Sequence, residues 1–133
     1  MIVEDDAALL RIECDVLSRS GFDVIPFSDP RRAWDSLSRG PAGVGVVLLD
    51  LWMPGLTGYE FLQSMRRDPA LGRIPVVVTT GAVPDSDRLL GAFATLLKPF
   101  TCDALVRAAE SAFRERDAAG LRSVRACAAF RAG

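Results

Sequence analysis

The amino-acid sequence predicts a doubly wound α/β fold built on a five-stranded parallel sheet of order 2-1-3-4-5. Short apolar runs of strand length alternate five times with segments of helical spacing. The two longest runs, residues 44–50 and 75–81, are continuous stretches rich in apolar and β-branched residues, which is typical of strands covered by helices on both faces. Right-handed crossovers leave few strand orders, and 2-1-3-4-5 is the common one for five strands.

Five strands and five helices are expected along the chain. The strands are predicted at residues 2–3, 22–27, 44–50, 75–81 and 95–97. The helices are predicted at residues 7–20, 29–40, 59–67, 86–90 and 101–116. The first strand is only a stub, although this topology places it at the centre of the sheet. Pro26 indicates that the second strand lies at a sheet edge, because proline cannot donate a hydrogen bond to a neighbouring strand.

The helices are recognised by apolar spacing and by the residues at their ends. The first helix has one apolar face, formed by Leu10, Cys14 and Leu17. Asp29 and Pro30 open the second helix as N-cap and first helical residue, and Thr101 caps the last one. The segment between the fourth and fifth strands has room for only a short helix, so we expect a reduced fourth helix in this fold.

Length and composition fit one domain. Half of the 133 residues are hydrophobic and a quarter are charged, which is enough apolar material for a core. We expect the domain to span residues 1–116. The alanine- and arginine-rich residues 117–133 form a C-terminal tail that either prolongs the last helix or is disordered.

Net charge and cysteine content indicate which partners and which cellular compartment to expect for the domain. The net charge of −1 gives no electrostatic reason to expect nucleic acid as a direct partner. No apolar run approaches the ~18 residues of a membrane span, and we find no signal peptide. Cys14, Cys102 and Cys127 lack the spacing of a metal site and suit a reducing compartment, so we expect a cytoplasmic location.

Polar residues follow four of the predicted strands at their carboxyl ends. Glu4 and Asp5 follow the first strand, Asp50 ends the third, Thr80 lies near the end of the fourth, and Lys98 follows the fifth. In a parallel sheet these ends share one edge, where open α/β sheets bind ligands. Each residue alone has an ordinary structural interpretation as a turn, cap or solvated residue, and the case for a site depends on their conjunction.

Coulomb's law gives the size of the repulsion between the carboxylates of such a cluster. Two carboxylates about 4 Å apart repel by about 1 kcal/mol in water and by about 4 kcal/mol at an effective dielectric constant near 20. Lys98, the single lysine of the chain, supplies one compensating charge. A hard divalent ion such as Mg²⁺ fits the oxygen ligands, since the chain contains no histidine. A carboxylate in this setting can accept a phosphoryl group covalently.

Four motifs together carry a family resemblance. They are Ile-Val-Glu-Asp-Asp at residues 2–6, Leu-Leu-Asp-Leu-Trp-Met-Pro-Gly-Leu-Thr-Gly at 48–58, Pro-Val-Val-Val-Thr-Thr-Gly at 75–81 and Leu-Lys-Pro-Phe at 97–100. In this order they resemble the receiver domain of two-component response regulators, which has a flavodoxin-like fold. The match extends to about Arg116.

The resemblance implies a phosphoacceptor. Asp50 would take a phosphoryl group from a histidine kinase or a histidine phosphotransfer protein, with Thr80 and Lys98 on the phosphoryl oxygens. It also implies a Mg²⁺ site formed by Glu4, Asp5, Asp50 and the backbone carbonyl of Trp52. The bond between Lys98 and Pro99 would be cis. The domain would catalyse only its own phosphorylation and dephosphorylation, and so would not be an enzyme acting on other substrates.

The resemblance further implies a conformational signal to a downstream protein target, and it leaves a homodimer open. Family members usually carry an aromatic residue three positions before the lysine, whereas this chain has Thr95. One alternative is therefore a degenerate receiver that binds a protein partner without being phosphorylated. Another is a phosphohydrolase of the haloacid dehalogenase type, but those enzymes carry Asp-x-Asp after the first strand, and the residue two after Asp50 is Trp52.

Overall fold

A computed structural model describes residues 1–41, 43–89 and 91–119. The five strands form one parallel sheet of order β2-β1-β3-β4-β5, as the sequence predicts. The strands are β1 (Ile2–Val3), β2 (Pro26–Phe27), β3 (Val47–Asp50), β4 (Val76–Thr80) and β5 (Ala94–Leu97). The helices are α1 (Ala7–Arg19), α2 (Pro30–Arg39), α3 (Gly58–Arg67), the 3-10 turn η1 (Ser86–Leu89) and α4 (Cys102–Ala118).

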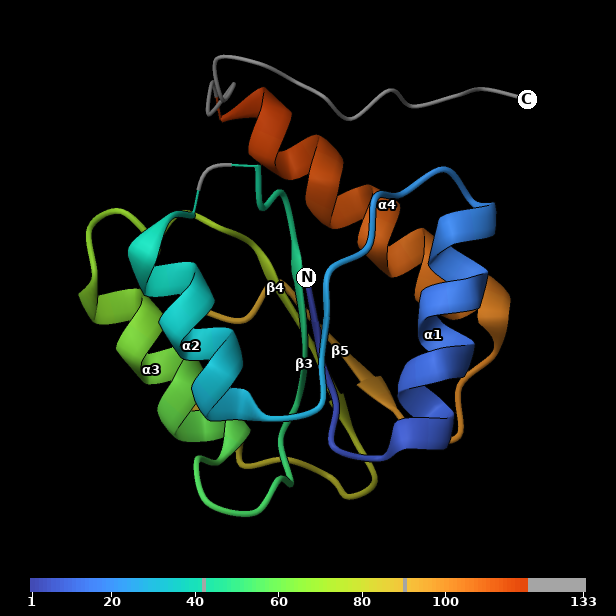
Figure 1. Ribbon diagram of the computed structural model, residues 1–133, viewed down its shortest axis with the longest axis horizontal. Helices are drawn as coiled ribbons and strands as arrows, with labels where there is room; N and C mark the ends of the chain where they lie inside the picture. The colour runs from blue at the N-terminus through green and yellow to red at the C-terminus, as the bar shows by residue number, and fades with distance from the viewer. Residues whose placement is uncertain (42, 90, 120–133) are drawn as a thin grey trace.

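The sheet lies between two layers of helices. Figure 1 shows α2 and α3 on one face and α1 and α4 on the other. One apolar cluster, with Phe61, Leu62 and Met65 of α3, fills the first interface. A second cluster, with Leu17 of α1 and Leu105 of α4, fills the other interface. β3 and β4 are buried at every position, which explains why their sequences are apolar without alternation.

The helices begin where side chains satisfy their free backbone N–H groups. Asp6 accepts hydrogen bonds from the backbone of Ala8 and Leu9, so α1 starts directly after the acidic residues of the first motif. Thr57 and Glu60 form a capping box at the start of α3. These caps fix where the connections after β1 and β3 end, and both connections border the predicted site.

Three strands are shorter than predicted: β4 (Val76–Thr80) lacks one expected residue at each end, and β2 and β3 lack more. The strand expected at residues 22–27 is reduced to Pro26–Phe27, because β1 has only two residues with which it can pair. Within residues 22–25 only the Ile25 carbonyl is bonded to β1, accepting from the backbone of Ile2. The strand expected at 44–50 begins at Val47, where its pairing with Val76 of β4 begins. The register of the neighbours therefore sets the strand lengths.

The described residues between β4 and β5 contain no full helix. The helix predicted at 86–90 is the single 3-10 turn η1, Ser86–Leu89, and residue 90 lies outside the described part. Two side chains of β5, those of Thr95 and Leu97, are exposed. The reduced fourth helix predicted from the sequence is thus confirmed.

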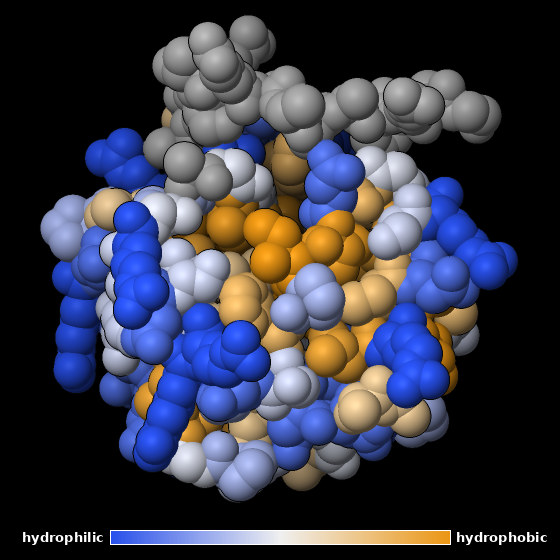
Figure 2. Space-filling model, in the orientation of Figure 1, coloured by the Kyte–Doolittle hydropathy of each residue, from blue (hydrophilic) through white to orange (hydrophobic). Residues whose placement is uncertain are grey.

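The last helix, α4, continues to Ala118, two residues past the predicted end of the domain. The rest of the predicted tail, residues 120–133, lies outside the described residues. None of the helices in the described ranges is long and apolar enough to cross a membrane. Figure 2 shows an apolar band between the hydrophilic sides of the two helix layers, on the face where the β2 edge of the sheet lies.

Candidate functional site

The register of the parallel sheet brings the predicted site residues to one edge. Val3 pairs with Leu49 of β3, so Glu4 follows β1 beside Asp50, the last residue of β3. Asp50 pairs in turn with Thr79, which precedes Thr80 at the end of β4. Thr80 is the partner of Leu97, the residue before Lys98. Segments up to 94 residues apart in the sequence meet here, as the contact between Lys98 and Glu4 shows.

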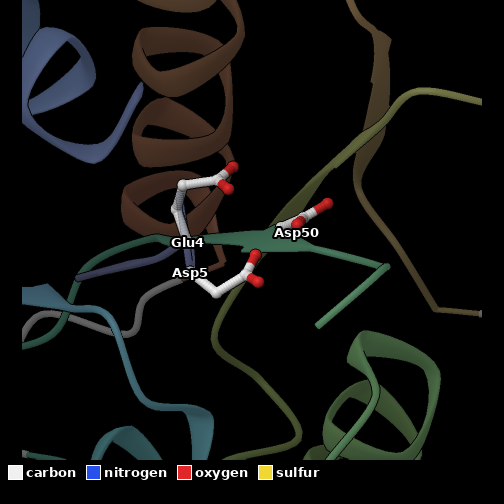
Figure 3. Close-up of side chains that lie close together, drawn as sticks. All are labelled: Glu4, Asp5 and Asp50. Carbon is white, nitrogen blue, oxygen red and sulfur yellow. The ribbon is translucent and has the colours of Figure 1, made fainter. Parts of the chain in front are cut away.

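Three carboxylates form the centre of the site. Glu4, Asp5 and Asp50 each offer an oxygen, and these oxygens lie within 4.8 Å of one another. Figure 3 shows that Glu4 and Asp5 extend from the end of β1 and Asp50 from β3, around a common space. Glu4 and Asp50 are almost fully buried, whereas Asp5 is exposed. The cluster is therefore accessible from solvent on the Asp5 side.

Lys98 supplies the positive charge that the cluster needs. Its Nζ donates to Glu4 Oε2 at 2.8 Å and lies 3.4 Å from Asp50 Oδ1. Burial by itself would lower the pKa of Lys98, but the hydrogen bond to Glu4 and the negative charges of Asp50 and Glu4 raise it above its ordinary value. The ammonium is consequently charged throughout the neutral range. The peptide bond between Lys98 and Pro99 is cis, which confirms that expectation.

Burial raises the pKa values of both buried acids. For Glu4, burial is the main cause, opposed by the hydrogen bond from Lys98 and reinforced by the charge of Asp50. For Asp50, burial again raises the pKa, while the charge of Lys98 and the backbone N–H of Trp52 lower it. The two acids therefore bind protons more readily than exposed carboxylates, and a cation that keeps them ionised would be bound.

The donor set fits a hard divalent ion. Mg²⁺ is held by oxygen ligands at about 2.1 Å, so opposite ligands stand about 4.2 Å apart, close to the spread of these three carboxylates. The backbone N–H of Trp52 donates to Asp50 Oδ1 at 3.3 Å, which places the connection after β3 against the cluster. The Trp52 side chain is 59% exposed. Glu4, Asp5 and Asp50 are the residues that could hold the ion.

Thr80 is buried at the edge of the site and bonds locally. Its hydroxyl donates to the Ala82 carbonyl at 3.0 Å and is close enough to accept from the Ala82 backbone N–H at 3.3 Å. Rotation about one side-chain bond would redirect this hydroxyl. A Cβ at the following residue, Gly81, would meet nothing within 4 Å.

Gly58 allows α3 to start directly behind the end of β3, which Asp50 occupies. A Cβ at this position would lie 2.2 Å from the Asp50 carbonyl oxygen and 2.6 Å from Leu51 Cα. The backbone N–H of Gly58 donates to the Leu51 carbonyl at 3.1 Å. Only glycine permits this approach, and the approach fixes the loop that carries Trp52.

An aromatic contact links that loop to the segment after β4. The Trp52 and Tyr59 rings meet edge to face with centroids 6.1 Å apart, and the Arg88 guanidinium lies 4.1 Å from the centroid of the Tyr59 ring. The Tyr59 hydroxyl accepts from the backbone N–H of Asp85 at 3.3 Å. Tyr59 therefore joins the loop after Asp50 to the segment that replaces a full fourth helix.

Glu13 is a buried acid that the sequence analysis missed. It lies on α1, is 1% exposed, and its Oε1 has no hydrogen-bond partner among the described residues. Burial, followed by the charge of Glu4, raises the pKa of Glu13 to about 7. The available signal was its position inside the apolar face of the helix, three residues after Leu10 and four before Leu17.

A separate hollow of about 330 Å³ lies near the start of β4 and contains none of these site residues. It is lined by Arg73, Pro75, Glu115, Arg116 and Ala119. The carboxylate cluster at the opposite end of the strands is therefore the candidate site.

Comparison with known proteins identifies the family. The family model for the response regulator receiver domain matches residues 1–110. The chain is 30% identical over 118 residues to the phosphate regulon transcriptional regulatory protein PhoB of Escherichia coli, covering 86% of this chain and 51% of PhoB. It is 34% identical over 120 residues to the transcriptional regulatory protein FixJ of Bradyrhizobium diazoefficiens, covering 89% of this chain and 58% of FixJ. The chain spans about half the length of the curated relatives it matches.

Solved structures agree with the fold. A CheY-like response regulator receiver domain protein from Methanospirillum hungatei aligns with a TM-score of 0.82 at 22% identity, covering 90% of this chain and 95% of that one. A receiver domain protein from Clostridium thermocellum aligns with a TM-score of 0.79 at 24% identity, covering 89% and 95%. The chain belongs to the family of response regulator receiver domains, the signalling modules of two-component systems.

Proposed function

We propose that this receiver accepts a phosphoryl group on Asp50, in a Mg²⁺-dependent reaction, from a histidine kinase or a histidine phosphotransfer protein. The observation that carries the proposal is the placement of the buried Asp50 carboxylate between the Lys98 ammonium and two further acids. A buried carboxylate surrounded in this way is a poor structural element and a well-placed nucleophile.

The two oxygens of Asp50 have different surroundings. Oδ1 lies 3.4 Å from Lys98 Nζ and accepts from the backbone N–H of Trp52 at 3.3 Å. Oδ2 has no hydrogen bond or ion pair among the described residues, so we assign it as the attacking atom. A bond forms between this oxygen and the phosphorus of the donor, while the bond from phosphorus to the donor nitrogen breaks. The electron pair of that bond leaves with the imidazole.

The remaining residues stabilise the transferred group. Glu4, Asp5 and Asp50, with the backbone carbonyl of Trp52, would hold Mg²⁺, which when bound neutralises charge on the phosphoryl oxygens. Lys98 would pair with one of these oxygens from the opposite side, since its Nζ already lies beside Asp50. The Thr80 hydroxyl would leave the Ala82 carbonyl and donate to another phosphoryl oxygen.

The signal would leave the site through this movement of Thr80. When the hydroxyl turns, the Ala82 carbonyl loses its hydrogen bond, and the segment from residue 81 to η1 is free to rearrange. We propose that residues 1–116 act as the receiver, with 117–133 as a C-terminal tail, and that the output is contact with a protein target rather than with nucleic acid. A cytoplasmic location belongs to the same proposal, since both cysteines in the described ranges are free thiols.

A second candidate function is protein binding without phosphorylation. The observation that favours it is the exposed Thr95 on β5, where receivers usually have an aromatic switch residue. Under this alternative the acidic cluster would be a remnant. The two functions differ in whether Asp50 can be modified.

Intact-protein mass after incubation with acetyl phosphate tests the proposal. We expect a gain of one phosphoryl group that requires Mg²⁺ and is absent in Asp50→Asn. Asp15→Asn is the matched control, since it makes the same chemical change on an exposed surface of α1 and should be phosphorylated like the wild type. No gain in folded wild-type protein, with acetyl phosphate or a phosphorylated kinase as donor, would favour the protein-binding alternative.

A further inference from the structure

Glu13 is an acid in a place where an acid is costly. Its neighbours along the buried face of α1 are Leu10 and Leu17, which belong to the apolar cluster between the sheet and α4. The α4 residues buried in the same cluster are apolar: Leu105, Ala109 and Ala112. A buried carboxylate oxygen without a hydrogen-bond partner usually marks a function or a missing ligand.

The charged groups that act on Glu13 all belong to the candidate site. They are Glu4 at the end of β1, Asp50 at the end of β3 and Lys98 after β5. On α1 itself, Cys14 is the neighbouring titratable group, and the amino group of Met1 acts on Cys14. Lys98 is therefore the positive group of this set that can compensate an ionised Glu13.

Lys98 has capacity for another partner. An ammonium group carries three N–H donors, whereas the Lys98 Nζ makes one hydrogen bond, to Glu4, and one longer contact, to Asp50. Both partners are carboxylates that would serve as Mg²⁺ ligands in the proposed function. Once Glu4 turns to the ion, the ammonium loses its shortest contact. Glu13 is a buried acid of the described chain whose Oε1 has no hydrogen-bond partner, and the charge of Lys98 acts on it.

We propose that Glu13 is a positioning residue for Lys98: when a divalent cation draws Glu4 into its coordination, the buried Glu13 carboxylate becomes the anionic partner of the Lys98 ammonium. The inference rests on the proposed metal site. It explains why a carboxylate is retained in an apolar helix face.

The transfer of Lys98 from Glu4 to Glu13 also involves the release of a proton. The raised pKa of Glu13 means that a large share of the molecules carry a proton on this carboxyl at neutral pH. Pairing with Lys98 requires the ionised form, so that proton passes to solvent as the cation binds. One divalent cation enters, up to one proton leaves from Glu13, and no bond other than O–H is broken.

The single lysine makes the exchange directly observable. Protein labelled with ¹³C at the lysine Cε gives one lysine signal, from Lys98. We expect Mg²⁺ to shift this signal in the wild type and in the control Asp15→Asn, and the shift to be largely lost in Glu13→Gln. An equal shift in wild type and Glu13→Gln would overturn the proposal.

A double-mutant cycle separates positioning from a general effect of charge. Mg²⁺ affinity, followed by tryptophan fluorescence, should fall several-fold in Glu13→Gln, because Lys98 then stays on Glu4 and competes with the ion. In a Lys98→Met background that competitor is absent, so the Glu13→Gln change should have little further effect. The same several-fold loss in both backgrounds would refute the proposal, since it would show a lysine-independent effect.

The outcomes also separate this inference from the proposed function. If wild-type protein binds no Mg²⁺, the proposed function and the inference fail together. If wild type binds Mg²⁺ and is phosphorylated while Glu13→Gln matches it in affinity and lysine shift, only the inference fails. Glu13→Leu provides a second variant that removes the carboxyl without leaving a polar group in the apolar face.

Discussion

Replacing Glu13 by glutamine should stabilise the metal-free protein at high pH. The pKa of Glu13 rises from an ordinary 4.5 to about 7 on folding, chiefly because the carboxyl is buried. At about 1.4 kcal/mol per pKa unit, the ionised carboxylate costs about 3 kcal/mol of folding free energy above pH 7. Between the two pKa values the folded state binds more protons than the unfolded state. Stability therefore falls as pH rises from about 4.5, and the loss is complete just above pH 7.

Urea unfolding followed by circular dichroism at pH 5 and pH 8, in the presence of EDTA, measures this effect. Glutamine does not titrate, so the stability of Glu13→Gln relative to wild type should improve by about 2–3 kcal/mol between the two pH values. The buried amide costs a roughly constant 1–3 kcal/mol at both, so the change with pH is the quantity to compare. Asp15→Asn, on the exposed side of the same helix, should show no such change. A pH-independent difference for Glu13→Gln would refute the reasoning.

Three further predictions follow from the site. Gly58→Ala should lower the free energy of unfolding by about 3 kcal/mol or more, because its Cβ would overlap the Asp50 carbonyl. Gly81→Ala, where a Cβ meets nothing, should change it by no more than about 0.5 kcal/mol. Urea unfolding measures both values, and equal effects would contradict the packing argument. Trp52→Ala should shorten the lifetime of the phosphorylated protein, because we expect the bulk of Trp52, whose backbone N–H donates to Asp50, to restrict the attacking water; an unchanged rate of dephosphorylation would reject this role. Mg²⁺ affinity, measured by calorimetry, should increase with pH above the ordinary carboxylate range, because burial raises the pKa values of Glu4 and Asp50; a flat profile above pH 5 would exclude it.

The sequence was sufficient to predict the strand order and the residues at the site edge. β3 and β4 are buried on both faces, and such strands are recognisable because apolar residues follow one another without alternation up to the polar residues at the carboxyl ends. Once the sheet is parallel, any polar residue that follows a strand arrives at the same edge, whatever its distance in the sequence. This is why Glu4 and Lys98, 94 residues apart, could be placed together before their contact was seen.

Strand lengths and Glu13 could not be predicted in the same way. Residues 22–25 have the composition of a strand, but pairing depends on the length of β1, which a local pattern does not contain. Glu13 lies on the inward face of α1 between the half-buried Leu10 and the buried Leu17, yet a glutamate at such a position normally extends to solvent along the helix surface. Its burial depends on how α1 is rotated against the sheet and α4, and that rotation is set by tertiary packing.

The charges at this edge oppose stability and favour ion binding for the same reason. Glu4, Asp5 and Asp50 lie together at this edge, and Lys98 is the ammonium that contacts Glu4 and Asp50. With an ionised Glu13, the metal-free site carries more negative charge than Lys98 can compensate. A site with balanced charges would fold more stably, but it would attract a divalent cation less. An ion that binds only the folded state stabilises it by RT ln(1 + [L]/Kd). The stability that these acids cost the metal-free protein is therefore offset when Mg²⁺ binds, and the offset grows with Mg²⁺ affinity. Glu13→Gln should accordingly raise the stability of the free domain at pH 8 and reduce the additional stabilisation that Mg²⁺ provides.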